Sequence, residues 1–243
     1  MTIRIAMWSG PRNLSTAMMR SFQARGDCAV SDEPFYAHYL AASGVVHPMQ
    51  EDILAAHDAD PARVIAHLTG AAPGDAPIWY QKHMPHHMIG SVPRDWFGAM
   101  RHAVLIRAPE RVVASFDAKR PAPDLEDIGV SQMDDVIADI VALTGDHPPV
   151  IEAEDVRANP AGMMRALCAA LDIRWTDAML EWPQGRRETD GVWGRHWYGA
   201  VERSTGFAPS PAPVGDLPSH LAAVVDAARP SFERLQARKL TPL

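Results

Sequence analysis

The first 24 residues contain a short apolar run, a glycine-containing turn and a helical pattern, in that order. Residues 3–8 have the length and apolar character of a buried strand. Residues 9–11 read Ser-Gly-Pro, which predicts a tight turn, and residues 15–24 have apolar side chains at helical spacing. A strand, a loop and a helix in this order form the phosphate-binding unit of α/β folds, so this unit limits the fold more than any other feature.

The loop between this strand and this helix is suited to an anion. The start of a helix presents unpaired backbone N–H groups, and the helix dipole adds positive potential there. The guanidinium of Arg12 and two hydroxyl groups supply further donors. We predict an anion site that includes Ser9, Gly10, Arg12, Asn13, Ser15 and Thr16. Taken alone, the same pattern also fits an ordinary strand–turn–helix unit in which a serine is the N-cap.

The loop does not match the Walker pattern of magnesium-nucleotide enzymes, which reads G-x-x-x-x-G-K-[ST]. Counted from Gly10, that pattern requires Gly, Lys and Ser or Thr, where this chain has Ser15, Thr16 and Ala17. The loop therefore lacks the phosphate-binding lysine and the metal-binding hydroxyl. A magnesium-dependent kinase or hydrolase on the same fold stays an alternative, although these positions count against it.

Further apolar runs alternate with helical patterns along the chain. The runs that predict strands are 28–30, 78–81, 103–106 and 150–151. This alternation predicts a three-layer α/β fold with a mostly parallel sheet flanked by helices. The length of 243 residues suits one domain over residues 1–243. Residues 183–218, rich in Pro, Gly, Trp and Arg, predict a long capping loop, and residues 217–238 predict a helix that Pro230 breaks or restarts.

A second anion site is predicted after the run 103–106. Arg107 ends that run, and Pro109 suits the first turn of a helix over residues 109–119. On such a helix Arg111 and Ser115 are four residues apart and share a face. Arg107, at the strand end, can reach the same side, so these three residues could together bind a second phosphate. A guanidinium binds phosphate with two parallel hydrogen bonds, and a Walker-type ATPase would have an acidic metal ligand at this strand end instead. Two anion sites without a metal carboxylate predict a nucleotide with separated phosphates and no magnesium.

With both motifs in place, the chain resembles the P-loop-like sulfotransferases that use 3′-phosphoadenosine-5′-phosphosulfate (PAPS). The loop 9–16 resembles the 5′-phosphosulfate loop of that family, and Arg107 followed eight residues later by Ser115 resembles its 3′-phosphate motif. The resemblance implies the P-loop NTPase-like sulfotransferase fold and PAPS as co-substrate. It also implies transfer to a hydroxyl or amine of a small-molecule or carbohydrate acceptor. Many cytosolic members have a lysine in the first loop, where this chain has Arg12.

The resemblance also implies catalytic roles for two residues near predicted strand ends. Glu33, in the segment Asp-Glu-Pro-Phe at 32–35, resembles the glutamate base of Golgi-type carbohydrate sulfotransferases. Lys82 resembles the lysine that contacts the transferred sulfuryl group in the same relatives. Without the resemblance, Glu33 would be read as a surface carboxylate or helix cap, and Lys82 as an exposed strand-end lysine.

A histidine cluster supplies the rival base. His83, His86 and His87 lie close together, and cytosolic relatives use a histidine, so we keep His83 as a catalytic candidate. His83 and His87 have the spacing of zinc ligands on a helix. Pro85 interrupts such a helix, and no glutamate follows His83 as in H-E-x-x-H, so we expect no metal.

Residues 193–207 are aromatic and basic for a loop. We expect either closure over the nucleotide, with Arg203 near a phosphate, or a capping loop packed by its tryptophans.

Composition limits the partners and the compartment. The net charge of −7 argues against nucleic-acid binding, which requires a basic surface. No run approaches the roughly 20 apolar residues of a membrane span, and the first residues are too short a run for a signal peptide. Cys28 and Cys168 fit buried free thiols, so we expect a cytoplasmic protein. The acceptor and the oligomeric state stay open, and a nucleotide-binding protein without catalysis is a further alternative.

Overall fold

A parallel sheet of five strands forms the centre of the computed structural model, which describes residues 2–90 and 92–243. The strand order is β2-β3-β1-β4-β5, and every neighbouring pair is parallel. The strands are β1 (Ile3–Ser9), β2 (Cys28–Asp32), β3 (Ile78–His83), β4 (Arg101–Ile106) and β5 (Val150–Glu152). The predicted α/β fold is confirmed, and the sheet is parallel throughout rather than mostly parallel.

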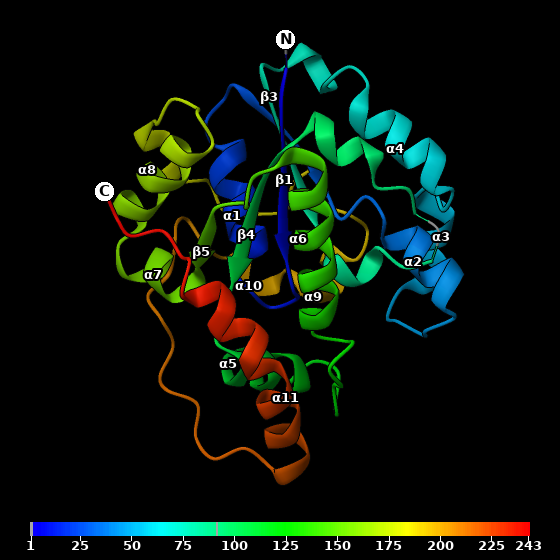
Figure 1. Cartoon of the computed structure of the whole chain (residues 1–243), viewed down its shortest axis with the longest axis vertical. Coiled ribbons are helices and arrows are strands. Elements are labelled where there is room, and N and C mark those ends of the chain that lie inside the picture. Colours follow the sequence, from blue (N-terminus) through cyan, green and yellow to red (C-terminus); the bar gives the residue numbers. More distant parts are fainter. Residues whose placement is uncertain (1, 91) are drawn as a thin grey trace.

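Helices cover both faces of the sheet (Figure 1). One face packs against α1 (Ser15–Gln23), α7 (Ala153–Ala158) and α8 (Pro160–Ala170). The other packs against α4 (Pro61–Thr69), α6 (Val130–Thr144) and α11 (Ser219–Gln236). Because successive strand residues point to opposite faces, Ile5 and Met7 of β1 belong to the first apolar cluster, whereas Ala6 and Trp8 belong to the second. Burial on both faces explains why the strands read as unbroken apolar runs.

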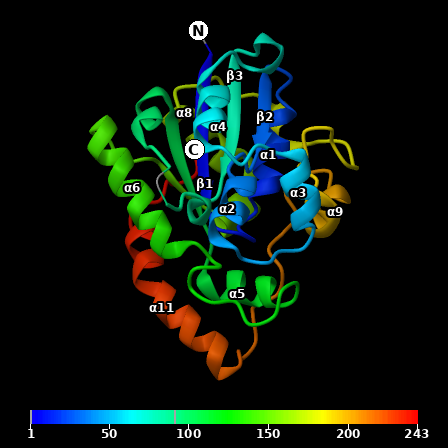
Figure 2. The ribbon, with the colours of Figure 1, turned by 90° about the vertical axis from the view of Figure 1, so that its right-hand side faces the viewer.

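Shorter helices complete the molecule. They are α2 (Tyr36–Ser43), α3 (Gln50–Ala56), α5 (Pro109–Asp117), α9 (Gly194–Trp197) and α10 (Gly199–Glu202). Four 3₁₀ segments are η1 (Pro73–Asp75), η2 (Pro85–His87), η3 (Asp95–Ala99) and η4 (Asp177–Leu180). Figure 2 shows α5 beyond the sheet, on the side toward which β1 points. The carboxyl ends of the strands, where parallel sheets bind ligands, therefore face α5.

Two segments differ from expectation. Residues 183–218, predicted as a loop, contain the short helices α9 and α10. The predicted break at Pro230 is wrong, because α11 continues through it from Ser219 to Gln236. Pro230 lies on the exposed side of α11, and buried residues on either side, such as Val225 and Phe232, hold the helix against the protein. None of the helices in the described residues has both the length and the apolar character that a membrane crossing requires.

Candidate active site

A cavity of about 340 Å³ lies beside the ends of β1, β3 and β4. Side chains from both halves of the predicted anion site line it, together with two of the three predicted catalytic residues. These predicted residues are Arg12, Asn13, Ser15, Thr16, Glu33, Lys82, Arg107 and Ser115. Segments that are far apart in the sequence thus open onto one shared space.

The loop 9–16 has the backbone shape of an anion-binding nest. Arg12 has a φ of 62° and Leu14 a φ of 74°, both left-handed, whereas Asn13 between them does not. Such alternation turns successive N–H groups toward one point. Leu14 is the N-cap of α1 and gives no side-chain capping bond, so no side chain occupies the N–H groups of the first turn in that way. The alternative of a serine N-cap is wrong.

Arg12 and Arg107 lie against each other at one end of the cavity, which we call the arginine end. The Nε group of Arg12 donates to Ser115 Oγ at 3.0 Å, and Nη1 of Arg107 donates to the carbonyl oxygen of Arg12 at 2.8 Å. Burial and the charge of Arg107 lower the pKa of Arg12. Glu154 accepts a bond from Arg107 at 3.0 Å. A negatively charged ligand would relieve the repulsion between the two guanidinium groups.

Arg157, at the end of α7, lines the same cavity and was not predicted. Burial lowers its pKa, and the charge of Arg107 lowers it further. Its Nε is buried without a hydrogen-bond partner in the described part of the chain. The position of Arg157 shortly after the predicted strand 150–151 is a signal that the analysis of strand ends could have used.

Arg111, in contrast, does not line the cavity. Its Nη1 donates to the carbonyl oxygens of Pro211 and Ala212, both at 3.2 Å. The predicted grouping of Arg107, Arg111 and Ser115 is therefore corrected: Arg111 shares Glu154 Oε1 with Arg107, at 3.6 Å and 3.0 Å, but its guanidinium binds the backbone at 211–212 outside the cavity.

Lys82 is the centre of a buried ion cluster at the other end of the cavity. Its Nζ lies 2.7 Å from Glu33 Oε1, 2.9 Å from Asp32 Oδ1 and 2.7 Å from Tyr198 Oη. Thr16 Oγ1, on the loop 9–16, is 3.3 Å away. Burial alone would lower the pKa of Lys82, but the charges of Asp32 and Glu33 outweigh it and raise the pKa well above its ordinary value. Lys82 is therefore a buried cation that touches the loop.

Glu33 combines strained backbone with a displaced pKa. Its φ of 41° is left-handed, which costs a non-glycine residue on the order of 1 kcal/mol. Its N–H donates to the carbonyl oxygen of Lys82 at 3.0 Å, which holds this conformation at the end of β2. Burial raises the pKa of the carboxyl group, and the charge of Lys82 offsets part of that rise. A carboxylate with a raised pKa, lining a cavity, has the properties of a general base.

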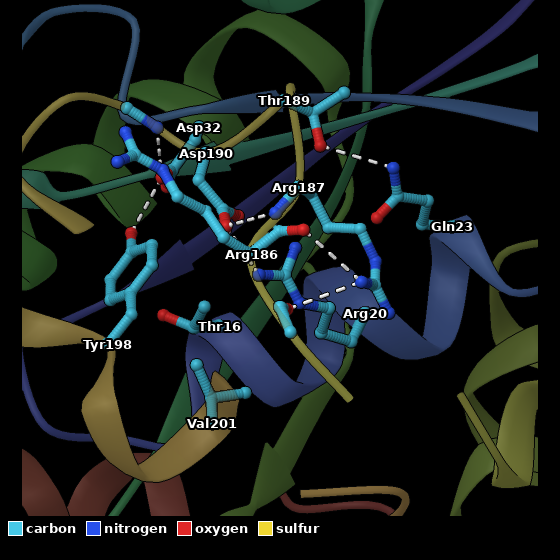
Figure 3. A network of polar contacts seen from close by, with 12 residues as sticks. Thr16, Arg20, Gln23, Asp32, Arg186, Arg187, Thr189, Asp190, Tyr198 and Val201 are labelled. Carbon is cyan, nitrogen blue, oxygen red and sulfur yellow. Dashed lines mark hydrogen bonds and ion pairs between the residues drawn. The ribbon is translucent and has the colours of Figure 1, made fainter. Parts of the chain in front are cut away.

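Tyr198 links the capping segment, residues 183–218, to the buried ion cluster around Lys82. Its hydroxyl donates to Asp32 Oδ2 at 2.6 Å and accepts from Lys82 Nζ and from Trp193 Nε1, the latter at 3.0 Å. A phenol has one donor and two acceptor positions, so all three are in use. Figure 3 shows the Tyr198 hydroxyl pointing at Asp32, with Thr16 nearby. The sequence analysis did not single out Tyr198 or Asp32.

A second buried contact holds the same segment to α1. Arg20 Nη2 lies 2.6 Å from Asp190 Oδ2, and both side chains are fully buried (Figure 3). The next residue, Gly191, donates its N–H to Asp32 Oδ2 at 3.2 Å. The capping segment is thus fixed both to the helix that follows the loop 9–16 and to the end of β2.

Comparison with known proteins identifies the family. A family model described as "Sulfotransferase domain" matches residues 3–239. The chain belongs to the sulfotransferase domain family. The predicted resemblance is confirmed by this match.

Two relatives and one solved structure are similar to this sulfotransferase. The Arabidopsis thaliana proteins "Branched-chain-amino-acid aminotransferase-like protein" 1 and 2 are 33% and 31% identical to it over 204 residues. The matches cover 84% of this chain but 36% of each relative, so the chain spans little more than a third of their length. The "Sulfotransferase Domain from the Synechococcus PCC 7002 Olefin Synthase" aligns with a TM-score of 0.50 at 16% identity, over 93% of this chain and 94% of that one. That likeness supports the fold.

Within this sulfotransferase, His83 lies away from the cavity. Its ring stacks on Trp8 at 4.7 Å, and its Nε2 lies 3.3 Å from Gln81 Oε1. Burial lowers its pKa to about 3. Because β3 continues through His83, this side chain points to the opposite face of the sheet from Lys82. We therefore leave His83 out of the catalytic set, and the cluster members that do line the cavity are His86 and His87.

Three predicted binding residues also lie outside the cavity. Ser9 is fully buried at the end of β1. Gly10 is needed for packing, because a Cβ there would lie 2.5 Å from the carbonyl oxygen of Ile128. Arg203 is exposed, and its carbonyl oxygen accepts a bond from Gln184. Across residues 2–90 and 92–243, no group of three or more His, Cys, Asp or Glu side chains is placed to hold a metal ion.

Proposed function

We propose that this sulfotransferase moves a sulfuryl group from PAPS to a hydroxyl or amine of a small acceptor. The observation that carries the proposal is that one cavity joins the Arg12–Arg107–Ser115 group to the Lys82–Glu33 pair. The first group supplies anion contacts, and the second supplies a cation and a base. The presence of both catalytic side chains in the cavity favours an enzyme over a non-catalytic nucleotide-binding protein.

The donor would lie along the arginine end of the cavity. The nest at Arg12–Leu14 and the first turn of α1 would hold the 5′-phosphosulfate, since backbone N–H groups there converge on an anion. Arg107 and Ser115 would hold the 3′-phosphate, with Arg157 adding positive charge. The direct contacts of Arg12 with both of these residues support two neighbouring anion sites, as one nucleotide with two phosphate positions requires.

The chemistry would be an in-line displacement at sulfur. The acceptor oxygen forms a bond to sulfur while the bond from sulfur to the bridging oxygen of the donor breaks, and the acceptor proton passes to Glu33. Lys82 would stabilise the negative charge that develops on the departing 3′,5′-bisphosphoadenosine. As in phosphoryl transfer, positioning and electrostatic stabilisation supply most of the catalysis.

The first test is binding of 3′,5′-bisphosphoadenosine in the presence of EDTA. At about 100 times its Kd, this ligand should raise Tm by about 5 °C or more, because a ligand that binds only the folded state adds about 2.7 kcal/mol. Differential scanning fluorimetry measures the shift. A shift with Mg-ATP, alongside none with millimolar bisphosphate, would support the magnesium-nucleotide alternative instead.

A second test separates the two phosphate positions. Arg107→Ala should weaken bisphosphate binding by about 10- to 100-fold, the worth of a charge-assisted hydrogen-bond pair, and should barely change binding of adenosine 5′-phosphate. Isothermal titration calorimetry with both ligands measures the difference. Arg203→Ala is the matched control, because Arg203 is an exposed arginine outside the cavity. Equal losses for both ligands would remove Arg107 from the 3′-phosphate site.

A further inference from the structure

A wall of stacked rings borders the cavity beyond Glu33. Tyr36 and Tyr39 come from α2, and His86 and His87 come from η2. The His87 ring stacks on both tyrosines, 4.7 Å from Tyr36 at an interplanar angle of 13° and 5.0 Å from Tyr39 at 26°. His86 meets Tyr39 edge-on at 5.3 Å. All four residues are less than a tenth exposed, so these ring surfaces are fixed before any ligand arrives.

The wall adjoins the candidate base. His87 Nε2 is 4.0 Å from Glu33 Oε2, the carboxylate oxygen that Lys82 does not contact. An acceptor whose hydroxyl reaches Glu33 therefore has its remaining atoms beside these rings. The wall is the part of the cavity that would select the acceptor.

His47, His86 and His87 are uncharged at neutral pH, and the part of the cavity that they line disfavours a positively charged group. Burial lowers the pKa of His47 to about 4 and that of His86 to about 3, and it lowers the pKa of His87 well below its ordinary value. The charge of Arg120 adds to the effect at His47, and the charge of Lys82 adds to it at His87. Asp127 opposes the effect at His47 and His86, so burial is the main obstacle that an ammonium group on an acceptor would share with these histidines.

Negative charge is opposed as well. Glu33 lies beside the wall, and Asp127 also lines the cavity. The cation next to Asp127 is Arg120, which is already paired with that carboxylate. Lys82 already has two carboxylate partners, and in the proposed transfer it serves the donor rather than the acceptor. A carboxylate or phosphate on the acceptor would thus face two acidic side chains and a polyanionic donor.

A sugar fits the wall poorly for a different reason. Several hydroxyl groups would lose water against the faces of Tyr36, Tyr39 and His87, and ring faces return few hydrogen bonds. Three buried nitrogens of cavity-lining histidines have no hydrogen-bond partner among the described residues, namely His47 Nε2, His86 Nδ1 and His87 Nδ1. That of His86 lies toward Gly129, 3.0 Å from where a Cβ would stand, so at most two remain for the several hydroxyl groups of a sugar. A flat apolar ring, in contrast, gains contact with aromatic faces.

We propose that the acceptor is an uncharged alcohol whose body is a flat, mainly apolar ring, bound against Tyr36, Tyr39 and His87 with its hydroxyl at Glu33. This inference rests on the proposed function and narrows it. It selects a hydroxyl over an amine, because an aliphatic amine carries a proton at neutral pH, and a small-molecule ring over a carbohydrate.

The test compares four probes that differ in charge and polarity. They are benzyl alcohol, 4-carboxybenzyl alcohol, 4-(aminomethyl)benzyl alcohol and methyl β-D-glucopyranoside. Their Kd values are measured at pH 7.5 by ligand-observed NMR titration, with saturating 3′,5′-bisphosphoadenosine and again without it. Benzyl alcohol should bind at least about tenfold more tightly than each of the other three, since each of them would bury a charge or several hydroxyl groups without partners.

Variants locate the binding to the wall. Tyr39→Leu removes a ring face and should weaken benzyl alcohol binding by about tenfold, whereas Tyr39→Phe keeps the ring and should change it by less than about twofold. Tyr80→Phe is the control, because Tyr80 is a fully buried tyrosine outside the cavity whose hydroxyl lacks a partner among the described residues. All three variants should bind the bisphosphate like the unaltered protein.

The outcomes separate this inference from the proposed function. The proposed acceptor class would be wrong if a charged probe or the glucoside bound as tightly as benzyl alcohol or more tightly. It would also be wrong if benzyl alcohol showed no saturable binding. If Tyr39→Leu and Tyr80→Phe weakened benzyl alcohol binding equally, benzyl alcohol would not bind at the wall of rings. Failure of the bisphosphate to bind would count against the proposed function, and the titrations without nucleotide would still rank the four probes.

Discussion

Replacing Glu33 with glutamine is expected to lower kcat for sulfuryl transfer by about 10²- to 10⁴-fold, the usual contribution of a general base. Glutamine has the same shape, but its amide cannot accept the acceptor proton. KM for PAPS should change by less than about threefold, because the donor contacts lie at the arginine end of the cavity. Steady-state kinetics with PAPS and benzyl alcohol measure both constants. Glu51→Gln, on the exposed surface of α3, is the matched control.

The pH dependence of the transfer rate, measured for the unaltered protein and for Glu33→Gln, identifies the base. Burial raises the pKa of Glu33 above its ordinary value of 4.5, so the rate should fall on the acid side with an inflection above 4.5, and Glu33→Gln should lack that limb. A raised folded-state pKa stabilises the fold below pH 4.5, and this contribution is lost as pH rises through the raised pKa. A variant that retains both the full kcat and the acid limb would exclude Glu33 as the base. His87, 4.0 Å away, would then be tested next.

The sequence predicted the sheet because β1, β3, β4 and β5 are buried on both faces over most of their length. In such strands the apolar run itself marks the element, and the residue after the run marks the ligand edge. Arg12 and Arg107 were located in this way, and the structure places both at one cavity. The rule needs only local information, which is why it worked for side chains that come from distant segments.

It was harder to predict from the sequence which face of the sheet a given strand side chain points to. The run 78–81 appeared to end before Lys82, whereas β3 continues through His83. Once both residues belong to one strand, their side chains must point to opposite faces, and only Lys82 can reach the cavity. His83 was kept as a candidate because cytosolic relatives use a histidine, and the two-residue error in the strand end concealed that its side chain points away from that of Lys82.

The remaining omissions depend on contacts across the whole chain. Tyr198 and Asp32 are 166 residues apart, and no spacing or period in the sequence links them. The stacking of His87 on Tyr36 and Tyr39 likewise follows from how η2 packs against α2. Tertiary packing of this kind leaves no local signal in the sequence. The wall of stacked rings could therefore be recognised only in the structure.

Lys82→Met should abolish detectable sulfuryl transfer and also lower the free energy of unfolding by about 3–5 kcal/mol, because it leaves two buried carboxylates without their cation. Methionine has a similar length, so little volume is lost. For a chain of this size the expected decrease in Tm is about 10 °C. Urea unfolding and a thermal melt measure the two quantities, and Lys119→Met, at an exposed lysine, is the control.

A second substitution separates the structural effect from the catalytic one. In Lys82→Met the carboxylates of Asp32 and Glu33 repel each other, so the destabilisation should be larger at pH 8 than at pH 5, because the raised pKa of Glu33 favours its uncharged form as the pH falls. Lys82→Met combined with Glu33→Gln should recover part of the stability at pH 8 without recovering activity. If the single variant were as stable as the unaltered protein at pH 8, the buried ion cluster would not exist in solution as described. If the double variant recovered activity, neither side chain would take part in the transfer.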